Sequence, residues 1–311
     1  MLFVAMGFLW TASQIPVYLY GGIIPDIIAD IGGADRYVWL LLAYLIPLAS
    51  ITPFVGPLAD LFGRKALALA SVVSMIIGTT ITSTAHSMNV FIGGMVFNGF
   101  GGGILELVAL AVVGESAPTA KRGLYIGAII LTILPYCPSV LWAQLIVFNS
   151  TWRYVGLWIA LWTLIGGVLT LFFYNPPHRP NAHGLTKWQI AKRIDVTGGI
   201  TSTAGLTLLL MSLTWGGNQY PWNSAHVIAT MTLGFFFILV WILWEIFFVK
   251  YPMFPRRLGA NPRALTIILL ITFVSGANFF AVLIFWPTQY YVTYADFRSP
   301  YSIGEGSLPV G

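Results

Sequence analysis

Long apolar runs alternate with short polar connections along almost the whole chain of 311 residues. An apolar run of about 20 residues is long enough to cross the hydrocarbon core of a bilayer as an α-helix. The pattern predicts nine such helices, at residues 3–25, 38–56, 66–85, 90–113, 124–147, 154–174, 197–215, 225–249 and 265–293. Glycine, proline and polar residues that favour turns lie between them. We therefore predict an all-α, polytopic helical membrane protein.

The basic residues of the connections predict which side of the membrane each connection faces. Cytoplasmic loops retain Lys and Arg. Every second connection faces the same side of the membrane. One such set of connections holds 12 of the 15 basic residues, and the other set holds only Arg36, Arg153 and Arg298. This bias predicts a cytoplasmic N-terminus. Three acidic residues follow the first span on the opposite side, where we expect an ordinary solvated loop rather than an ion-attracting vestibule: Asp26, Asp30 and Asp35.

The composition narrows the class of protein. Apolar residues make up 58% of the chain and charged residues only 8%, far below the roughly 25% of a soluble domain. The net charge of +5 does not indicate nucleic-acid binding, because the basic residues form no continuous run. The four histidines lack the spacing of metal ligands, and a single cysteine, Cys137, excludes an intrachain disulfide. We expect no metal, no cofactor and no enzymatic nucleophile with its base.

The longest basic connection divides the chain. Within it, apolar residues recur at helical spacing from Leu185 to Ile194 around Trp188, which favours a short helix on the cytoplasmic leaflet over a flexible linker. We expect four regions: a six-helix half at 1–174, a cytoplasmic loop with this amphipathic segment at 175–196, two additional membrane helices at 197–249, and the start of a second half at 250–311.

The connection between the second and third spans reads GPLADLFGRK at residues 56–65. Gly56 and Gly63 permit a tight reversal there. The pattern G-x-L-A-D-x-x-G-R-K resembles the signature loop of the major facilitator superfamily of transporters. That resemblance implies a latch between inward-facing and outward-facing states, made by Gly56, Asp60, Gly63, Arg64 and Lys65. A second loop, GESAPTAKRG at 114–123, resembles another element of the superfamily and predicts that Glu115 pairs with Arg122 on the inner face.

Four further stretches narrow the resemblance. YGGIIPDIIADIGG, ILPYCPSVLWAQLI, KYPMFPRRL and FVSGANFFAVLIFWPTQYY are similar to the fungal trichothecene efflux pump family, within the fourteen-span, drug:proton antiporter-like branch. The resemblance covers essentially the whole chain, and because such relatives have five more spans, we expect a truncated chain. It implies a secondary active transporter in the plasma membrane that exports a hydrophobic toxin, drug or secondary metabolite by alternating access coupled to protons. Iron-siderophore uptake and a non-transporting role, as a receptor-like or fragmentary membrane protein, stay open as alternatives.

Glu106 is an acidic residue within the fourth predicted span. An ionisable group inside a membrane helix is costly and is by default a functional candidate. The sequence departs from the wider antiporter pattern at Met95 and around Cys137, so we expect Glu106 to replace the usual proton-coupling residues. The alternative is a protonated or hydrogen-bonded glutamate that only packs helices. The nearby glycines, Gly99 and Gly101 to Gly103, favour close helix packing rather than a nucleotide site.

Polar and aromatic residues inside the spans are candidates for contact with a substrate. A mostly apolar wall with a few amides and hydroxyls suits a medium-sized hydrophobic or amphipathic molecule better than a sugar or an ion. Transporter sites lie near the membrane midplane, often beside interrupted helices. The candidates are Gln14, Tyr18, Asn98, Tyr136, Gln144, Asn278, Phe279 and Gln289. The expected partners are thus the lipid bilayer, this substrate and protons.

Overall fold

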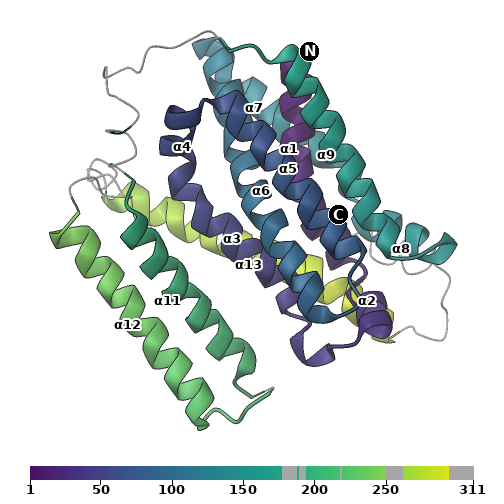
Figure 1. Cartoon of the computed structure of the whole chain (residues 1–311), viewed down its shortest axis with the longest axis vertical. Coiled ribbons are helices and arrows are strands. Elements are labelled where there is room, and N and C mark those ends of the chain that lie inside the picture. Colours follow the sequence, from purple (N-terminus) through teal and green to yellow (C-terminus); the bar gives the residue numbers. More distant parts are fainter. Residues whose placement is uncertain (177–187, 189–193, 218, 250–261, 294–311) are drawn as a thin grey trace. The chain divides into compact units, whose positions relative to one another are not determined.

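The computed structural model describes residues 1–176, 188, 194–217, 219–249 and 262–293. These residues are mostly helical and belong to two compact units (Figure 1). The first unit contains most of the helices before residue 177, and the second contains α11 and α12. Each unit is described by itself below.

The first unit is a bundle in which long helices pack side by side. Its helices are α1 (Leu2–Gly21), α2 (Ile24–Ile31), α3 (Trp39–Ile51), α5 (Arg64–Ser83), α6 (Met88–Ser116), α7 (Arg122–Ile130), α8 (Ser139–Asn149) and α9 (Arg153–Phe173). The helix α1 packs against both α6 and α9, α5 packs against the same two helices, and α3 packs against α6. The bundle core therefore lies around α1 and α6.

Eight helical segments of the described residues are long and apolar enough to cross a membrane. They match the first eight predicted spans, and α13 (Pro262–Thr293) occupies the position of the ninth. The all-α prediction is confirmed for the described residues, which contain helices and one isolated β-bridge but no strand. The predicted amphipathic segment at 185–194 lies outside the described residues, except for Trp188 and Ile194.

The glycines of α6 allow neighbouring helices to approach its backbone closely. A Cβ added to Gly101 would lie 2.8 Å from the carbonyl oxygen of Ser71 in α5. A Cβ added to Gly103 would lie 2.8 Å from the carbonyl oxygen of Leu48 in α3. Real Cβ atoms do not approach that closely. These glycines therefore serve helix packing, as the sequence predicted.

The second and fifth spans differ from simple helices. The second continues through the 3₁₀ turn Thr52–Phe54 into α4 (Val55–Phe62), and the chain reverses only at Gly63, where φ is +84°. Gly56 lies inside α4 with open space around it, so the prediction that it shares in a tight reversal was wrong. The fifth span changes to a 3₁₀ helix over Leu131–Tyr136, because Pro135 and Pro138 lack the N–H that an α-helix requires.

The second unit contains an antiparallel hairpin of α11 (Val196–Trp215) and α12 (Ala225–Phe247) (Figure 1). Asp195 caps the start of α11 by accepting a hydrogen bond from the backbone N–H of Gly198 at 2.9 Å. The same carboxyl oxygen accepts a hydrogen bond from the indole N–H of Trp244, near the end of α12, at 3.2 Å. Asp195 thus ties the two ends of the hairpin together. The predicted division at 174, 196 and 249 stays a prediction.

Candidate functional site

Polar contacts gather at the two opposite ends of the first unit and at one place between them. Because successive membrane helices alternate in direction, residues near the ends of α1, α5 and α8 and the starts of α6 and α9 share one end. We name it the Asp30 end. The starts of α5 and α7 and the ends of α6 and α9 share the other, which we name the Arg64 end.

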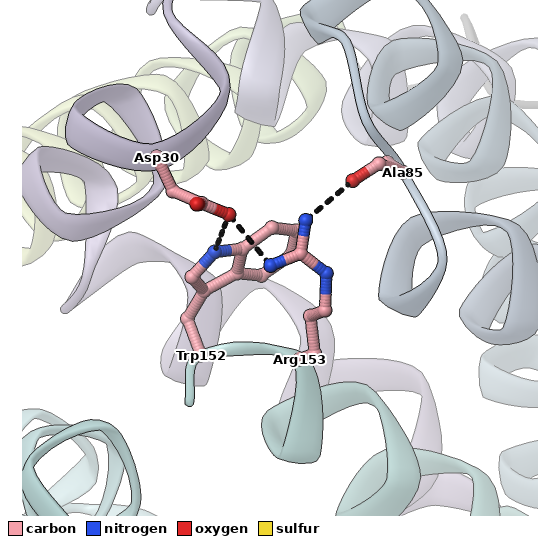
Figure 2. Close-up of polar contacts among 4 residues, drawn as sticks. All are labelled: Asp30, Ala85, Trp152 and Arg153. Atoms are coloured by element: carbon pink, nitrogen blue, oxygen red, sulfur yellow. Dashed lines mark hydrogen bonds and ion pairs between the residues drawn. The ribbon is translucent and has the colours of Figure 1, made fainter. Parts of the chain in front are cut away.

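At the Asp30 end, Arg153 joins three segments of chain (Figure 2). Its Nη1 donates to Asp30 Oδ2 in α2 at 2.6 Å, and its Nη2 donates to the carbonyl oxygen of Ala85, just after α5, at 2.9 Å. The indole N–H of Trp152 donates to the same Asp30 oxygen at 2.9 Å. The Arg153 guanidinium also lies 4.6 Å from the centroid of the Trp152 ring, within cation–π distance. We name these four residues the Asp30 clasp.

The hydrogen bonds of the clasp stabilise the charged form of Asp30. Donation from Trp152, and then donation from Arg153, hold the pKa of the Asp30 carboxyl below its ordinary value of 3.8. Asp30 is therefore an anion at neutral pH, and the minority basic residue Arg153 is neutralised by it. The other described basic residue of this end, Arg36, donates to Asp35 at 3.1 Å and to Asn89 at 2.6 Å.

The expectation of an ordinary solvated loop after the first span was wrong for two of its three acids. Asp26 and Asp30 lie in α2, and Asp26 Oδ2 accepts a hydrogen bond from the buried amide of Gln144 at 3.1 Å. The partners of these two carboxylates come 118 to 123 positions later in the sequence. Such distant partners leave no local signal near residues 26–30.

At the Arg64 end, the signature loop is joined to two other helices. Arg64, at the start of α5, forms an ion pair with Glu115 at the end of α6. Lys65 Nζ donates to the carbonyl oxygen of Leu171 at 2.7 Å and to Asn175 Oδ1 at 2.9 Å, where α9 ends. A cation at a helix C-terminus is favourable because the last carbonyl groups carry partial negative charge. The structure pairs Glu115 with Arg64 rather than with Arg122, the partner expected from the sequence.

Within the described part of the chain, no comparable side-chain contact is found for the remaining members of the predicted latch. Asp60 is exposed, and Gly56 has open space on the side where a Cβ would stand. Both lie in α4, whose residues 56–61 group with the second unit. Their latch role stays a prediction.

Between the two ends, four residues from α1, α3 and α6 form a polar group around Glu106. The partly buried Glu106 carboxyl lies close to the Gln14 side chain. Gln14 Nε2 also donates to Ser13 Oγ at 3.1 Å, and the buried hydroxyl of Tyr44 donates to the Ser13 carbonyl. We name Ser13, Gln14, Tyr44 and Glu106 the Glu106 cluster. The structure thus brings together Gln14 and Glu106, which the sequence singled out separately.

The other substrate candidates of the first unit lie apart from this cluster. Asn98 is fully buried against Gly78 of α5, which makes it a packing residue of the α5–α6 contact. The Tyr136 hydroxyl accepts a hydrogen bond from Trp158 Nε1 at 2.9 Å, and its ring stands edge-on to Trp162. Gln144 lies at the Asp30 end.

Tyr18 and the candidates of α13 complete the set. Tyr18 is partly buried on α1, near Cys137. On α13, Asn278 and Gln289 are exposed, whereas the side chain of Phe279 lies outside the described residues. The substrate role of all these residues stays a prediction.

Comparison with known proteins identifies the family. The fungal trichothecene efflux pump family (TRI12) matches residues 3–298. The chain belongs to this family. The resemblance of the four sequence stretches to the trichothecene efflux pumps is therefore confirmed, and the chain is a multi-pass integral membrane protein of major facilitator type.

The chain is similar to individual transporters from fungi and from a bacterium. The MFS-type transporter ucsD of Acremonium sp is 31% identical over 87% of this chain and 46% of its own length. The efflux pump FUS6 of Gibberella moniliformis is 27% identical, over 93% and 51%. The multidrug transporter protein MdtP of Bacillus subtilis is 28% identical, over 92% and 50%. The chain spans about half the length of these curated relatives.

Several polar residues of this family member were missed by sequence reasoning: Ser13, Tyr44, Trp152 and Arg153. A signal existed for Arg153, since it is one of only three basic residues in the minority set of connections. A cation retained on the unfavoured side needs a local partner. No comparable signal marks Ser13 or Tyr44, because hydroxyl groups are tolerated at many positions of membrane helices.

Proposed function

We propose that this chain serves the export of a small hydrophobic or amphipathic metabolite as a secondary active transporter. In this proposal its N-terminus is cytoplasmic, and it lies in the plasma membrane. The observation that carries the proposal is the match to the trichothecene efflux pump family over nearly the whole chain. The names of its relatives, efflux pump and multidrug transporter, support export of metabolites or drugs over iron-siderophore uptake.

In this proposal Glu106 carries the coupled proton. A carboxylate within a membrane helix costs several kcal/mol unless it is paired or protonated. The Gln14 amide lies close to the carboxyl, and Ser13 and Tyr44 complete its polar surroundings. Glu106 therefore has a polar partner for the charged form and an apolar surrounding that favours the neutral form. A proton carrier needs both forms to be accessible.

The contacts at the Arg64 end support the proposed latch. Gly56, Asp60, Gly63, Arg64 and Lys65 would bias the alternating-access equilibrium, with Glu115 as the acceptor on α6. An exposed ion pair contributes at most about 1 kcal/mol. That amount changes the ratio of two conformations by roughly fivefold, since 1.4 kcal/mol corresponds to about tenfold. A latch of this size is weak enough to open during each cycle.

Substrate contact is proposed for eight polar and aromatic side chains inside the helices. Gln14 and Tyr18 lie one helical turn apart on α1, so one face of that helix offers an amide and a hydroxyl. The other proposed contacts are Asn98, Tyr136, Gln144, Asn278, Phe279 and Gln289. An apolar wall with few polar groups fits a hydrophobic metabolite.

Flux measurements in vesicles test this proposal. Membrane vesicles that contain the chain should accumulate a radiolabelled trichothecene when a proton gradient is imposed, and vesicles without the chain should not. Glu106→Gln should remove the dependence on the gradient, while Asp35→Asn, an exposed acid in the 3₁₀ turn Ala34–Arg36, should leave it unchanged. Equal accumulation with and without the chain would overturn the transport proposal. Accumulation of a ferric siderophore instead would favour uptake.

A further inference from the structure

A row of polar positions runs along α1 from the Glu106 cluster toward the Asp30 end. Gln14, Tyr18 and Gly22 follow one another at intervals of four residues, which places them on one face of a helix. Helix α1 ends at Gly21, and Asp26, four residues after Gly22, lies in the first turn of α2. The row therefore begins beside a carboxyl inside the membrane and ends at a carboxyl near its surface.

Helix α8, and the residues just before it, lie next to this row. Tyr18 lies near Cys137. A Cβ on Gly22 would stand 3.0 Å from Val140 Cα, so α8 contacts α1 directly there. One turn later, the Gln144 amide donates to the Gly22 carbonyl at 3.2 Å and to Asp26 Oδ2 at 3.1 Å. Gln144 is only 5% exposed, so this polar contact lies inside the protein rather than in water.

Two buried polar atoms flank the row without a hydrogen-bond partner in the described part of the chain. The indole N–H of Trp10 lies one turn before Gln14 on α1, and the Ser139 hydroxyl lies at the start of α8. The two residues are only 8% and 1% exposed. Buried polar groups in proteins are satisfied by protein, water or ligand. Both atoms are therefore positioned to bind internal water beside the row.

We propose that this row is the path by which protons reach Glu106 from the Asp30 end, with Asp26 as its terminal acid. The path consists of Asp26, Gln144, Tyr18, Gln14 and Glu106, with water between the side chains. A proton leaves the Asp26 carboxyl, passes along water and the Tyr18 hydroxyl, and protonates the Glu106 carboxylate. Asp26 becomes an anion and Glu106 becomes neutral, so the total charge of the row is unchanged. The inference rests on the proposed proton role of Glu106.

The surroundings of the two carboxyls give them different roles. The Glu106 carboxyl lies close to the neutral side chains of Gln14 and Tyr44, and Tyr18 lies near Cys137. Asp30 lies one turn beyond Asp26 on α2 but is held by Arg153 and Trp152. An acid in a tight ion pair does not exchange its proton readily. Asp26 accepts a hydrogen bond from the buried Gln144 amide, which joins it to the row, and we therefore assign it as the terminal acid.

Hydrogen–deuterium exchange at Glu106 tests this path. The chain, reconstituted in lipid bilayers, is followed by infrared spectroscopy at a pH where the protonated carboxyl band is present, and Glu106→Gln identifies that band. After a change to D₂O buffer, Asp26→Asn and Tyr18→Phe should each slow the deuterium shift roughly tenfold or more, because a positioned proton-transfer group contributes at least about that much. Asp26→Glu should restore the rate. Asp35→Asn, on an exposed acid of the same end, should leave the rate unchanged.

The outcomes separate this inference from the function on which it rests. Wild-type exchange rates in both Asp26→Asn and Tyr18→Phe would overturn the path and leave Glu106 as a proton site. A titrating band that persists in Glu106→Gln would instead overturn the proton role itself. Asp26→Asn keeps an acceptor oxygen for Gln144, and an unchanged circular dichroism spectrum would show that it has folded.

Discussion

At the scale of single residues, the two described basic residues on the unfavoured side of the charge pattern are each matched with an acid. Arg36 contacts Asp35, and Arg153 contacts Asp30. Cations on the side that membrane insertion disfavours are thereby neutralised locally. The planar guanidinium of Arg153 can make more contacts here than a lysine ammonium could. It donates hydrogen bonds from two different nitrogens and lies over the indole ring of Trp152.

The lowered pKa of Asp30 predicts how the clasp responds to acid. Because the folded-state pKa lies below the ordinary value of 3.8, the carboxylate stabilises the fold at pH values above 3.8. That contribution is lost as the pH falls through the lowered folded-state pKa. Since Asp30 and Arg153 are partly exposed, we expect at most about 1 kcal/mol. Asp30→Asn should therefore lower the thermal unfolding temperature of the detergent-solubilised chain at pH 7 but not in strong acid.

A matched variant separates the two causes of this pKa. Trp152→Phe removes the hydrogen bond that lowers the pKa of Asp30 most but keeps an aromatic ring beside Arg153. It should raise the pKa of Asp30 toward its ordinary value, so the acid transition moves to higher pH. An unchanged transition in Trp152→Phe would contradict the assigned hydrogen bond.

At the scale of elements, α6 is the helix on which the bundle is assembled. Its glycines contact α3 on one face and α5 on another. Because glycine has no side chain, the backbones of these helices can approach the α6 backbone directly. In a bilayer, helices gain little from hiding apolar surface, because lipid is equally apolar, and close packing takes its place. The positions of these glycines therefore determine how the bundle packs.

Two alanine substitutions on α6 test this reliance on close packing. A Cβ at Gly103 would meet the Leu48 carbonyl oxygen at 2.8 Å and Ile51 Cγ2 at 2.7 Å, and a backbone atom cannot move aside easily. We expect Gly103→Ala to destabilise the chain by about 1–3 kcal/mol, as overpacking does. Gly93→Ala on the same helix meets nothing within 4 Å and should be neutral or slightly stabilising. Denaturant titration of both variants in detergent checks the difference.

The sequence was sufficient to predict the helices but not every break in them. Each span needs a long apolar run, and that local property is visible in the residues themselves. The helix α2 was missed because its eight residues follow the first span with no polar gap before Asp26. The extension of the second span to Phe62 was missed because Gly56 and Pro57 suggested a turn. Pro57 stands near the start of α4, where its missing N–H costs nothing.

The candidate site was predicted only in part, for a similar reason. Glu106 and Gln14 were each visible as polar residues in apolar runs, whereas their meeting depends on how α1 packs against α6. The ion pair of Arg64 with Glu115 joins two loops that both looked functional, yet sequence spacing favoured Arg122 as the nearer partner. The packing of α5 against α6 instead pairs Glu115 with Arg64, which lies 51 positions earlier in the sequence.

At the scale of the whole molecule, the charges of the first unit are sorted between its two ends. The Asp30 end carries acids that neutralise its few cations, and the Arg64 end carries Arg64, Lys65, Lys121 and Arg122. Contacts within each end confirm that the helices alternate in direction. They do not by themselves distinguish the cytoplasmic side, which follows only from the charge bias.

Cysteine labelling tests the predicted orientation directly. In a Cys137→Ser background the chain has no other cysteine, so single cysteines can be placed at exposed positions of the two ends. Ser87 is exposed at the Asp30 end and Lys121 at the Arg64 end. With a cytoplasmic N-terminus, a membrane-impermeant maleimide should label Ser87→Cys in intact cells and Lys121→Cys only after permeabilisation. The reverse labelling would place the basic end outside, which would also remove the proposed latch from the cytoplasmic face and reverse the direction of the proposed proton path.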